Sequence, residues 1–207
     1  YMIEDNAQSP FAMEGKHYAG TVGDIGVFSF NIHKHLQCGE GGICVTNSAK
    51  FASALRMARN HGELAGYPVG LNMRMTEVTA SIALAQLAKR EQIISSRIEL
   101  AEELTHMACN IPGMRPPIVR EDCKHVYYIW SLLTERPVHR GWFVQAMRDR
   151  GVPLSAGYVR PLYGLPAFSK SQSYCPVTED VERRIVMFEV CAWDPTRAQM
   201  KQFAEAF

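Results

Sequence analysis

One lysine, Lys34, lies between a predicted strand and a glycine-rich turn, and this arrangement constrains the fold more than any other feature of the sequence. The run Ile25 to Phe30 is rich in β-branched and aromatic residues and predicts a strand, and residues 39–42 read Gly-Glu-Gly-Gly. An isolated lysine is usually a solvated surface residue. Glycines, however, allow the backbone to pack closely around a neighbouring side chain. The pattern therefore predicts a lysine held on a loop at the mouth of a sheet.

A second strand-like run ends in an acid. Residues 1–3 are apolar and are followed by an acidic pair that includes Asp5, and Gln8 comes three residues later. A buried strand that ends in a carboxylate presents the acid at the carboxyl edge of a sheet. Ser29 and Lys34 likewise come at or just past the end of a predicted strand. Both runs therefore predict polar side chains at strand ends of an α/β sheet.

The rest of the chain alternates between strand and helix patterns. Thr76 is the predicted N-cap of one long helix that extends to about Met107 and links two domains. After the prolines at residues 112–117, the pattern favours a small second α/β domain. We expect the first domain to cover residues 1–88, and the linking helix and second domain to cover residues 89–207. The other predicted strands are residues 43–46, 126–133 and 152–159, and the other predicted helices are residues 49–60, 142–150, 180–190 and 196–207.

The charge balance and the cysteines narrow the class of protein. The 207 residues include 22 Lys and Arg and 21 Asp and Glu, for a formal net charge of +1. This balance gives no electrostatic reason to expect binding to nucleic acid or to an anionic membrane. No segment has the ~20 consecutive apolar residues that span a bilayer. The six cysteines form no CxxC pair and no zinc-ligand spacing. We therefore expect free thiols, no metal, no secretion signal and a cytoplasmic protein.

Three motifs follow one another in a specific order, at residues 3–8 (IEDNAQ), 23–34 (GDIGVFSFNIHK) and 39–42 (GEGG). Together they resemble the DegT/StrS-type sugar aminotransferases, which are fold type I enzymes that use pyridoxal 5'-phosphate. The resemblance continues at residues 59–62 and 70–77 and, more loosely, toward the C-terminus, so it covers nearly the whole chain. It implies an α/β fold: the distal part of a three-layer α/β/α cofactor domain, followed by a small C-terminal α/β domain.

The resemblance implies a role for each of five residues. Lys34 forms a Schiff base with the aldehyde of pyridoxal phosphate and then moves a proton as acid and base. Asp5 pairs with the pyridinium nitrogen and keeps the ring an electron sink. Gln8 helps to orient the ring, and Ser29 donates to the phosphate. Asn72 reaches the phosphate of a neighbouring subunit's cofactor, which implies a homodimer with shared active sites.

Two further residues, His33 and Tyr158, are candidates for contacts with the substrate. His33 directly precedes the lysine, and Tyr158 lies in a segment that approaches the substrate side of the pocket in the family. The implied reaction transfers an amino group from glutamate or glutamine to a nucleotide-linked keto-sugar or a keto-cyclitol, in the biosynthesis of amino sugars, polysaccharides or antibiotics. Glu40 and Arg74 are expected to have structural roles.

The chain departs from the family in its length, because full-length members are nearly twice as long. It lacks their N-terminal phosphate-binding turn and the aromatic residue that stacks on the ring. We therefore expect a fragment that by itself binds the cofactor poorly and is inactive. Two alternatives stay open: an inactive fragment or non-catalytic homologue, and a sugar dehydratase of the same fold. In the dehydratases a histidine replaces the lysine, so Lys34 argues against that alternative, although His33 and His35 flank it.

Overall fold

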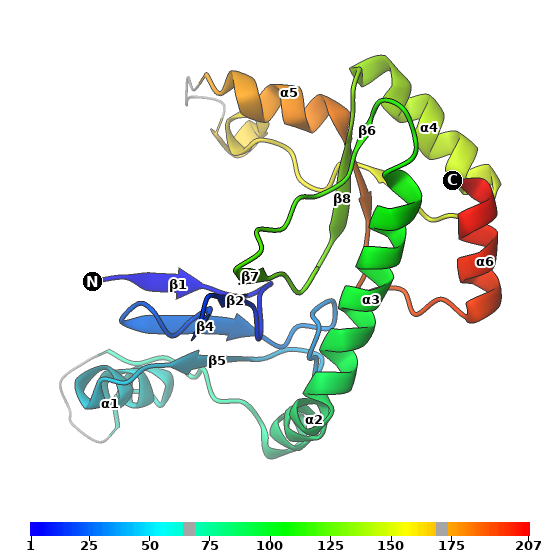
Figure 1. Ribbon diagram of the computed structural model, residues 1–207. Helices are drawn as coiled ribbons and strands as arrows, with labels where there is room; N and C mark the ends of the chain where they lie inside the picture. Colours follow the sequence, from blue (N-terminus) through cyan, green and yellow to red (C-terminus); the bar gives the residue numbers. More distant parts are fainter. Residues whose placement is uncertain (64–68, 169–173) are drawn as a thin grey trace. The chain divides into compact units, whose positions relative to one another are not determined.

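The computed structural model describes residues 1–63, 69–168 and 174–207 (Figure 1). The described residues form both helices and strands, which confirms the predicted α/β class. Four glycine and proline residues predict a loop at residues 61–72, and residues 64–68 of this loop lie outside the described residues. Among the helices that are described, none is both long and apolar enough to cross a lipid bilayer.

The chain forms two compact units, each made of two segments. The first unit comprises Tyr1–Ile98 and Val119–Tyr128, and the second comprises Glu99–Ile118 and Ile129–Phe207. The segment Val119–Tyr128 therefore returns from the second half of the chain to the first unit. The division into domains at residue 88 stays a prediction.

A three-stranded sheet positions the motif residues in the first unit (Figure 1). Strands β1 (Ile3–Asp5) and β4 (Ile25–Ser29) run parallel, and β5 (Gly42–Val45) pairs with β4 in the antiparallel direction, in the order β1-β4-β5. The carboxyl ends of parallel strands meet at the same edge of a sheet. Asp5 and the loop that follows Ser29 therefore lie at one edge.

The loop that precedes β4 is held against β1 by the carboxylate of Glu4. This carboxylate accepts hydrogen bonds from the backbone N–H groups of Gly20 and Val22 at 2.8 Å each, and of Gly23 at 2.5 Å. These bonds, chiefly that of Gly23, lower the pKa of Glu4 below its usual value of 4.5. A Cβ atom on Gly26 of β4 would lie 2.2 Å from the carbonyl oxygen of Gly20, so strand and loop approach too closely for any other residue.

A small second sheet joins the returning segment to the first unit. Strand β2 (Met13–Glu14) pairs with β3 (His17–Tyr18) as a hairpin and with β7 (Cys123–Lys124) on its other side, in the order β3-β2-β7. Both pairings are antiparallel. Because β7 belongs to the returning segment, this pairing is one way in which that segment is fixed to the first unit.

The N-cap predicted at Thr76 is confirmed, and the preceding helix has a cap of the same kind. Helix α1 (Ala49–Arg59) begins after Ser48, whose hydroxyl oxygen accepts the backbone N–H of Phe51 at 3.4 Å. The next helix begins after Thr76, whose hydroxyl oxygen accepts the backbone N–H of Thr79 at 3.2 Å. Each cap satisfies a backbone donor that has no partner within its helix.

The single long helix predicted at residues 76–107 is wrong, because the chain forms two helices there. Helix α2 (Glu77–Ala88) ends at Lys89, and α3 (Arg90–Ala108) follows directly. The backbone N–H of Lys89 bonds back to carbonyls of α2, and its own carbonyl accepts the N–H of Ile93 at 3.0 Å. Lys89 thus closes one helix and opens the next without a proline or a glycine.

The second unit contains a four-stranded antiparallel sheet. Its strands are β6 (Met114–Arg115), β8 (Trp130–Thr134), β10 (Ile185–Phe188) and β9 (Ser155–Ala156), in that order across the sheet. The other elements of this unit are the part of α3 from residue 99 onward, the helices α4 (Pro137–Asp149), α5 (Pro176–Arg184) and α6 (Arg197–Ala206), and the 3₁₀ helices η1 (Leu162–Gly164) and η2 (Pro166–Phe168). Helix α3 thus contributes to both units.

The second unit has an apolar core of its own. Trp130 of β8, Phe188 of β10, Phe203 of α6 and Leu104 of α3 are almost completely buried. The indole N–H of Trp130 donates to the hydroxyl of Thr105 at 2.8 Å, so the polar atom of this buried ring is satisfied.

The helix predicted at residues 180–190 is wrong in its second half. Helix α5 ends at Arg184, and the Ile-Val-Met-Phe run that follows forms β10. This run is apolar and pairs with β8 along its whole length. Burial against a neighbouring strand therefore makes this run a strand, although its local pattern is helical. The helix predicted at residues 196–207 is confirmed as α6.

Three further predictions in this part of the chain are wrong in their bounds. The strand predicted at residues 126–133 begins only with β8 at residue 130, since residues 119–128 belong to the first unit. The strand predicted at residues 152–159 is limited to β9. The helix predicted at residues 142–150 begins earlier, at Pro137, because proline fits the first position of a helix.

Candidate functional site

The loop between β4 and β5 carries Lys34 and is closed at its base by backbone hydrogen bonds. The N–H of Phe30 donates to the carbonyl of Gly41 at 2.8 Å, and the N–H of Cys38 donates to the carbonyl of Phe30 at 2.9 Å. Gly39 has a φ of +91°, a conformation that favours glycine. The glycine turn noted in the sequence therefore closes the lysine loop.

Asn31 ties the two ends of this loop together. Its backbone N–H donates to the hydroxyl oxygen of Ser29 at 3.2 Å, and its side-chain N–H donates to the carboxylate of Glu40 at 2.7 Å. Its side-chain oxygen accepts the backbone N–H of His33 at 3.0 Å. Since the Ser29 oxygen acts as an acceptor here, its hydroxyl proton remains a donor for another group.

Lys34 and His35 both contact the returning segment, residues 119–128. The Nζ atom of Lys34 lies 4.4 Å from the centre of the Tyr128 ring, within the range of a cation–π interaction. The buried ring of His35 forms a hydrogen bond through Nε2 with the carbonyl oxygen of Val126, at 2.7 Å. Burial is the main reason that the pKa of His35 falls to about 4, so the ring is neutral at neutral pH.

Sequence reasoning assigned no role to Tyr128 and noted His35 only as a neighbour of the lysine. His35 and Val126 are 91 residues apart, and no periodic pattern links the two segments. The aromatic character of residues 126–133 predicted a strand, whereas residues 126–128 cover the lysine loop. The contact follows from long-range packing, which local patterns do not reveal.

Asp5 lies exposed at the end of β1, with its Oδ1 atom accepting the backbone N–H of Ala7 at 3.1 Å. Gln8 is exposed in the turn that follows. The N–H of Asn6 donates to the carbonyl of Val27 at 2.8 Å, which continues the parallel pairing just past Asp5. The structure thus brings Asp5 and the start of the lysine loop to the same edge of the first sheet.

Asn72 is exposed and belongs to a polar cluster organised by Arg74. The guanidinium donates to the side-chain oxygens of Asn72 and Asn60, both at 3.1 Å, and forms a hydrogen bond with Nε2 of His61 at 3.1 Å. Asn60 and Asn72 also form an isolated β-bridge. Arg74 therefore orients the Asn72 side chain.

The two candidate substrate residues lie in different units. His33 is exposed on the lysine loop of the first unit. Tyr158 lies in the second unit, in the loop after β9, and is 49% exposed. The structure does not bring these two residues together within one unit.

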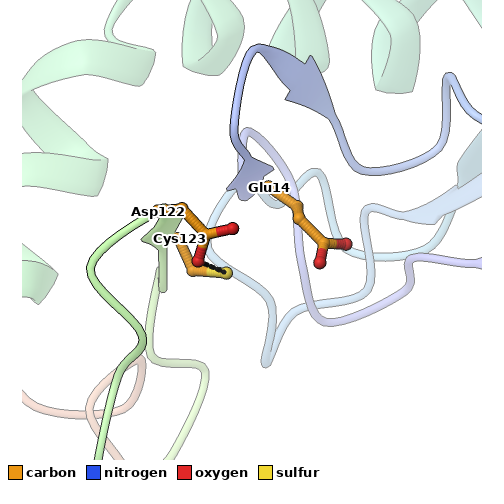
Figure 2. Close-up of side chains that lie close together, drawn as sticks. All are labelled: Glu14, Asp122 and Cys123. Carbon is orange, nitrogen blue, oxygen red and sulfur yellow. Dashed lines mark hydrogen bonds between the residues drawn. The ribbon is translucent and has the colours of Figure 1, made fainter.

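Glu14, Asp122 and Cys123 form a cluster of potential metal ligands in the described part of the chain, shown in Figure 2. Their ligand atoms all lie within 4.8 Å of one another. Arg120 donates to the Glu14 carboxylate and, at 3.1 Å, to the Cys123 sulfur, and its Nε atom lies 3.6 Å from Asp122. The guanidinium of Arg120 therefore already supplies the positive charge that a metal ion would otherwise provide. We interpret the cluster as an ion-pair network between β2 and β7.

Comparisons with known proteins were made at the level of sequence and of structure. A sequence model of the DegT/DnrJ/EryC1/StrS aminotransferase family matches residues 1–203. The dTDP-3-amino-3,4,6-trideoxy-alpha-D-glucose transaminase of Micromonospora megalomicea subsp. nigra is 30% identical over 86% of this chain and 50% of its own length. The GDP-perosamine synthase of Vibrio cholerae is 30% identical over 81% of this chain and 47% of its own length. The chain spans about half the length of the curated relatives it matches.

Solved structures share the fold of the chain. DesV from S. venezuelae, solved in complex with a ketimine intermediate, is 27% identical with a TM-score of 0.86 over 99% of this chain and 56% of that one. The aminotransferase from Psychrobacter cryohalolentis is 25% identical with a TM-score of 0.88 over 100% of this chain and 60% of that one. These likenesses confirm the predicted fold class, and the sequence match confirms the predicted resemblance. The chain therefore belongs to the DegT/DnrJ/EryC1/StrS aminotransferase family.

Proposed function

We propose that this chain contributes the reactive lysine, Lys34, to a pyridoxal phosphate-dependent aminotransferase. The enzyme moves an amino group from glutamate or glutamine to a nucleotide-linked keto-sugar or a keto-cyclitol, in the biosynthesis of amino sugars, polysaccharides or antibiotics. Relatives named as a dTDP-sugar transaminase and a GDP-perosamine synthase support a sugar acceptor. The observation that carries the proposal is the placement of Asp5 and the lysine loop at one edge of the parallel pair β1 and β4.

The groups at this edge fit pyridoxal phosphate chemically. When bound, this cofactor supplies an aldehyde carbon that reacts with amines and a protonated ring that withdraws electrons. The primary amine of Lys34 suits the aldehyde, and the exposed carboxylate of Asp5 suits the ring nitrogen. The hydroxyl of Ser29 has a proton to donate to the phosphate, and the amide of Gln8 suits the polar edge of the ring.

Lys34 and Asp5 carry the chemical work in this proposal. As a free amine, Nζ of Lys34 acts as a nucleophile, and it also takes up a proton and returns it. Asp5 contributes a fixed negative charge, because the hydrogen bond from Ala7 orients its carboxylate at the end of β1. The presence of Lys34, rather than a histidine at this position, favours amino transfer over the dehydratase alternative.

We infer that the active enzyme is a cytoplasmic homodimer in which Asn72 serves the neighbouring subunit. The oxygen of its side chain is held by Arg74, so the amide N–H₂ group is the part that can donate to a phosphate. His33 and Tyr158 are the proposed contacts to the substrate. Among the described residues none of the six cysteines forms a disulfide, as is usual in a reducing compartment.

A spectroscopic titration tests the role of Lys34. The chain is titrated with pyridoxal phosphate, and the visible absorbance is compared among the wild type, Lys34→Ala and Lys50→Ala, a matched control at an exposed position of α1. At a cofactor concentration high enough to overcome the weak binding expected of this chain by itself, the proposal expects a specific band in the wild type and in Lys50→Ala that is absent in Lys34→Ala. The same band in all three proteins would contradict it.

A second variant tests the carboxylate. Asp5→Asn keeps the size of the side chain and the acceptor oxygen for Ala7 but removes the negative charge. The proposal expects weaker binding of pyridoxal phosphate and an altered spectrum. Binding and a spectrum identical to those of the wild type would exclude Asp5 as the partner of the ring nitrogen.

A further inference from the structure

Residues 125–128, which follow β7, are an irregular segment with an unusual backbone. Tyr127 has a φ of +48°, in the left-handed region that bulky residues rarely adopt. Its N–H donates to Nδ1 of His125 at 3.1 Å, and the centres of the two rings are 4.3 Å apart. Tyr127 is only 6% exposed, so packing holds the conformation. Strained backbone conformations of this kind persist only where surrounding contacts hold them in place, and they are common at functional sites.

The groups on either side of Tyr127 contact two consecutive residues of the lysine loop. The carbonyl oxygen of Val126 lies 2.7 Å from Nε2 of His35. The ring of Tyr128 lies 4.4 Å from Nζ of Lys34, and its centre is 6.2 Å from the centre of the His35 ring. Residues 126–128 therefore hold the loop at the reactive lysine and at the residue that follows it.

His35 is suited to hold the loop and not to exchange protons. Its ring is 3% exposed, and its Nδ1 atom has no hydrogen-bond partner among the described residues. Because a carbonyl oxygen only accepts, Nε2 of His35 carries the proton and donates it to Val126. Burial keeps the ring neutral at neutral pH, so it does not compete with the Lys34 ammonium for the face of Tyr128.

We propose that Tyr128 and His35 are positioning residues for Lys34. The ring of Tyr128 holds Nζ in place before the lysine reacts, and His35 anchors the backbone of the loop to the carbonyl of Val126. A lysine side chain has many rotamers, and an amine that is already restrained loses less conformational freedom when it forms a covalent bond. The inference rests on the proposed function in one respect, the reactive role of Lys34.

The first test observes the contact directly and needs no cofactor. The lysines are reductively methylated with ¹³C-formaldehyde, which keeps their charge, and the Lys34 methyl signal is identified by its loss in Lys34→Arg. In the wild type we expect an upfield ring-current shift of this signal and a nuclear Overhauser effect to the Tyr128 ring. Both persist in Tyr128→Phe and disappear in Tyr128→Leu. Their absence in the wild type overturns the proposal without any variant.

The second test addresses the anchor. His35→Gln keeps a side-chain donor for Val126, whereas His35→Leu removes it. We expect the Lys34 methyl signal to stay near its wild-type position in the first variant and to lose its upfield shift in the second. The amide signal of Gly23, which depends on its bond to Glu4, verifies that the first unit is folded in each variant. An unchanged Lys34 signal in folded His35→Leu refutes the anchoring role.

The third test measures the consequence for reactivity. Each protein is treated with pyridoxal phosphate and borohydride, and mass spectrometry gives the ratio of labelling at Lys34 to labelling at exposed Lys50. We expect Tyr128→Leu to lower this ratio by at least about 2-fold, because the unrestrained amine loses more conformational freedom when it reacts, and Tyr128→Phe to preserve it. An unchanged ratio in Tyr128→Leu overturns the positioning role. Equal labelling of the two lysines in the wild type refutes the proposed function instead, and the methyl signal still decides whether Tyr128 holds Lys34.

Discussion

The hydrogen bonds of Glu4 lead to a prediction about how stability depends on pH. Its carboxylate accepts three backbone N–H groups, those of Gly20, Val22 and Gly23, and so holds the loop before β4 against β1. Glu4→Gln keeps the shape of the side chain but removes the charge and replaces one acceptor oxygen with an N–H₂ group. One of the three donors thereby loses its partner, and the others bond to a neutral oxygen.

The size of the effect follows from these bonds. A hydrogen bond to a charged group contributes about 1.5–3 kcal/mol when it is well buried. Glu4 is half-buried, so water replaces part of what is lost. We therefore expect Glu4→Gln to lower the free energy of unfolding by about 1–2 kcal/mol at neutral pH.

The sign of the pH dependence is fixed by the direction of the shift. The pKa of Glu4 in the folded chain lies below the usual value of 4.5. Its contribution is therefore fully present above about pH 4.5 and is lost as the pH falls through the lower folded-state value. The difference in stability between the wild type and Glu4→Gln should accordingly shrink in acid.

Urea unfolding at pH 7 and in steps down to pH 3 measures this difference, and hydrogen exchange at Gly20, Val22 and Gly23 locates it. The matched control is Glu121→Gln, at an exposed position of the same unit. The reasoning is refuted if Glu4→Gln is no less stable than this control at pH 7, or if its deficit stays constant across the pH range.

Three other predictions concern packing and capping. Gly26→Ala places a Cβ atom 2.2 Å from the carbonyl oxygen of Gly20 and should lower the free energy of unfolding, measured in urea, by about 1–3 kcal/mol. The control Gly141→Ala, with no heavy atom within 4 Å of the added Cβ, should not destabilise the protein. Phe188→Ala removes a fully buried ring and should lower the stability of the second unit by about 3–5 kcal/mol, measured by calorimetry. A loss of less than about 1 kcal/mol would contradict the burial of this ring. Thr76→Ala removes the N-cap of α2 and should destabilise this helix by about 1 kcal/mol, whereas Thr76→Ser preserves the cap. Hydrogen exchange of the α2 amides measures the difference, and equal exchange in both variants would exclude the capping role.

The strand ends at the site could be predicted because they depend on local patterns. The apolar run before Asp5 and the β-branched run before Ser29 each form a strand, and each ends where the polar residues begin. The two strands lie next to each other and run parallel. This pairing is a property of the whole fold and not of either local pattern. The sequence indicated this only through the resemblance to a family.

Two errors in secondary structure have different physical origins. The break at Lys89 lies between two helical patterns with no proline or glycine, so periodicity alone could not reveal it. The apolar run Ile185–Phe188 is short enough to suit a helix or a buried strand. Its pairing with β8 decides in favour of the strand, and that partner lies about 50 residues earlier in the chain.

The surroundings of the lysine could not be predicted from the sequence. The histidine after Lys34 could be a solvated or a packed residue, and only its bond to Val126 distinguishes them. The same holds for Tyr128, which belongs to a run that predicts a strand. It contacts Lys34 and directly follows Tyr127, whose left-handed backbone conformation residue types alone do not predict.

The most direct test of the central claim is to map where pyridoxal phosphate attaches to the chain. The protein is incubated with the cofactor and reduced with borohydride, and peptide mass spectrometry then compares labelling at each lysine before and after the change Lys34→Arg. We predict that Lys34 is labelled in strong preference to exposed lysines such as Lys50, and that Lys34→Arg leaves only weak labelling spread over the surface. Labelling that does not distinguish Lys34 from exposed lysines, or that persists unchanged in Lys34→Arg, would contradict the assignment of Lys34 as the reactive residue.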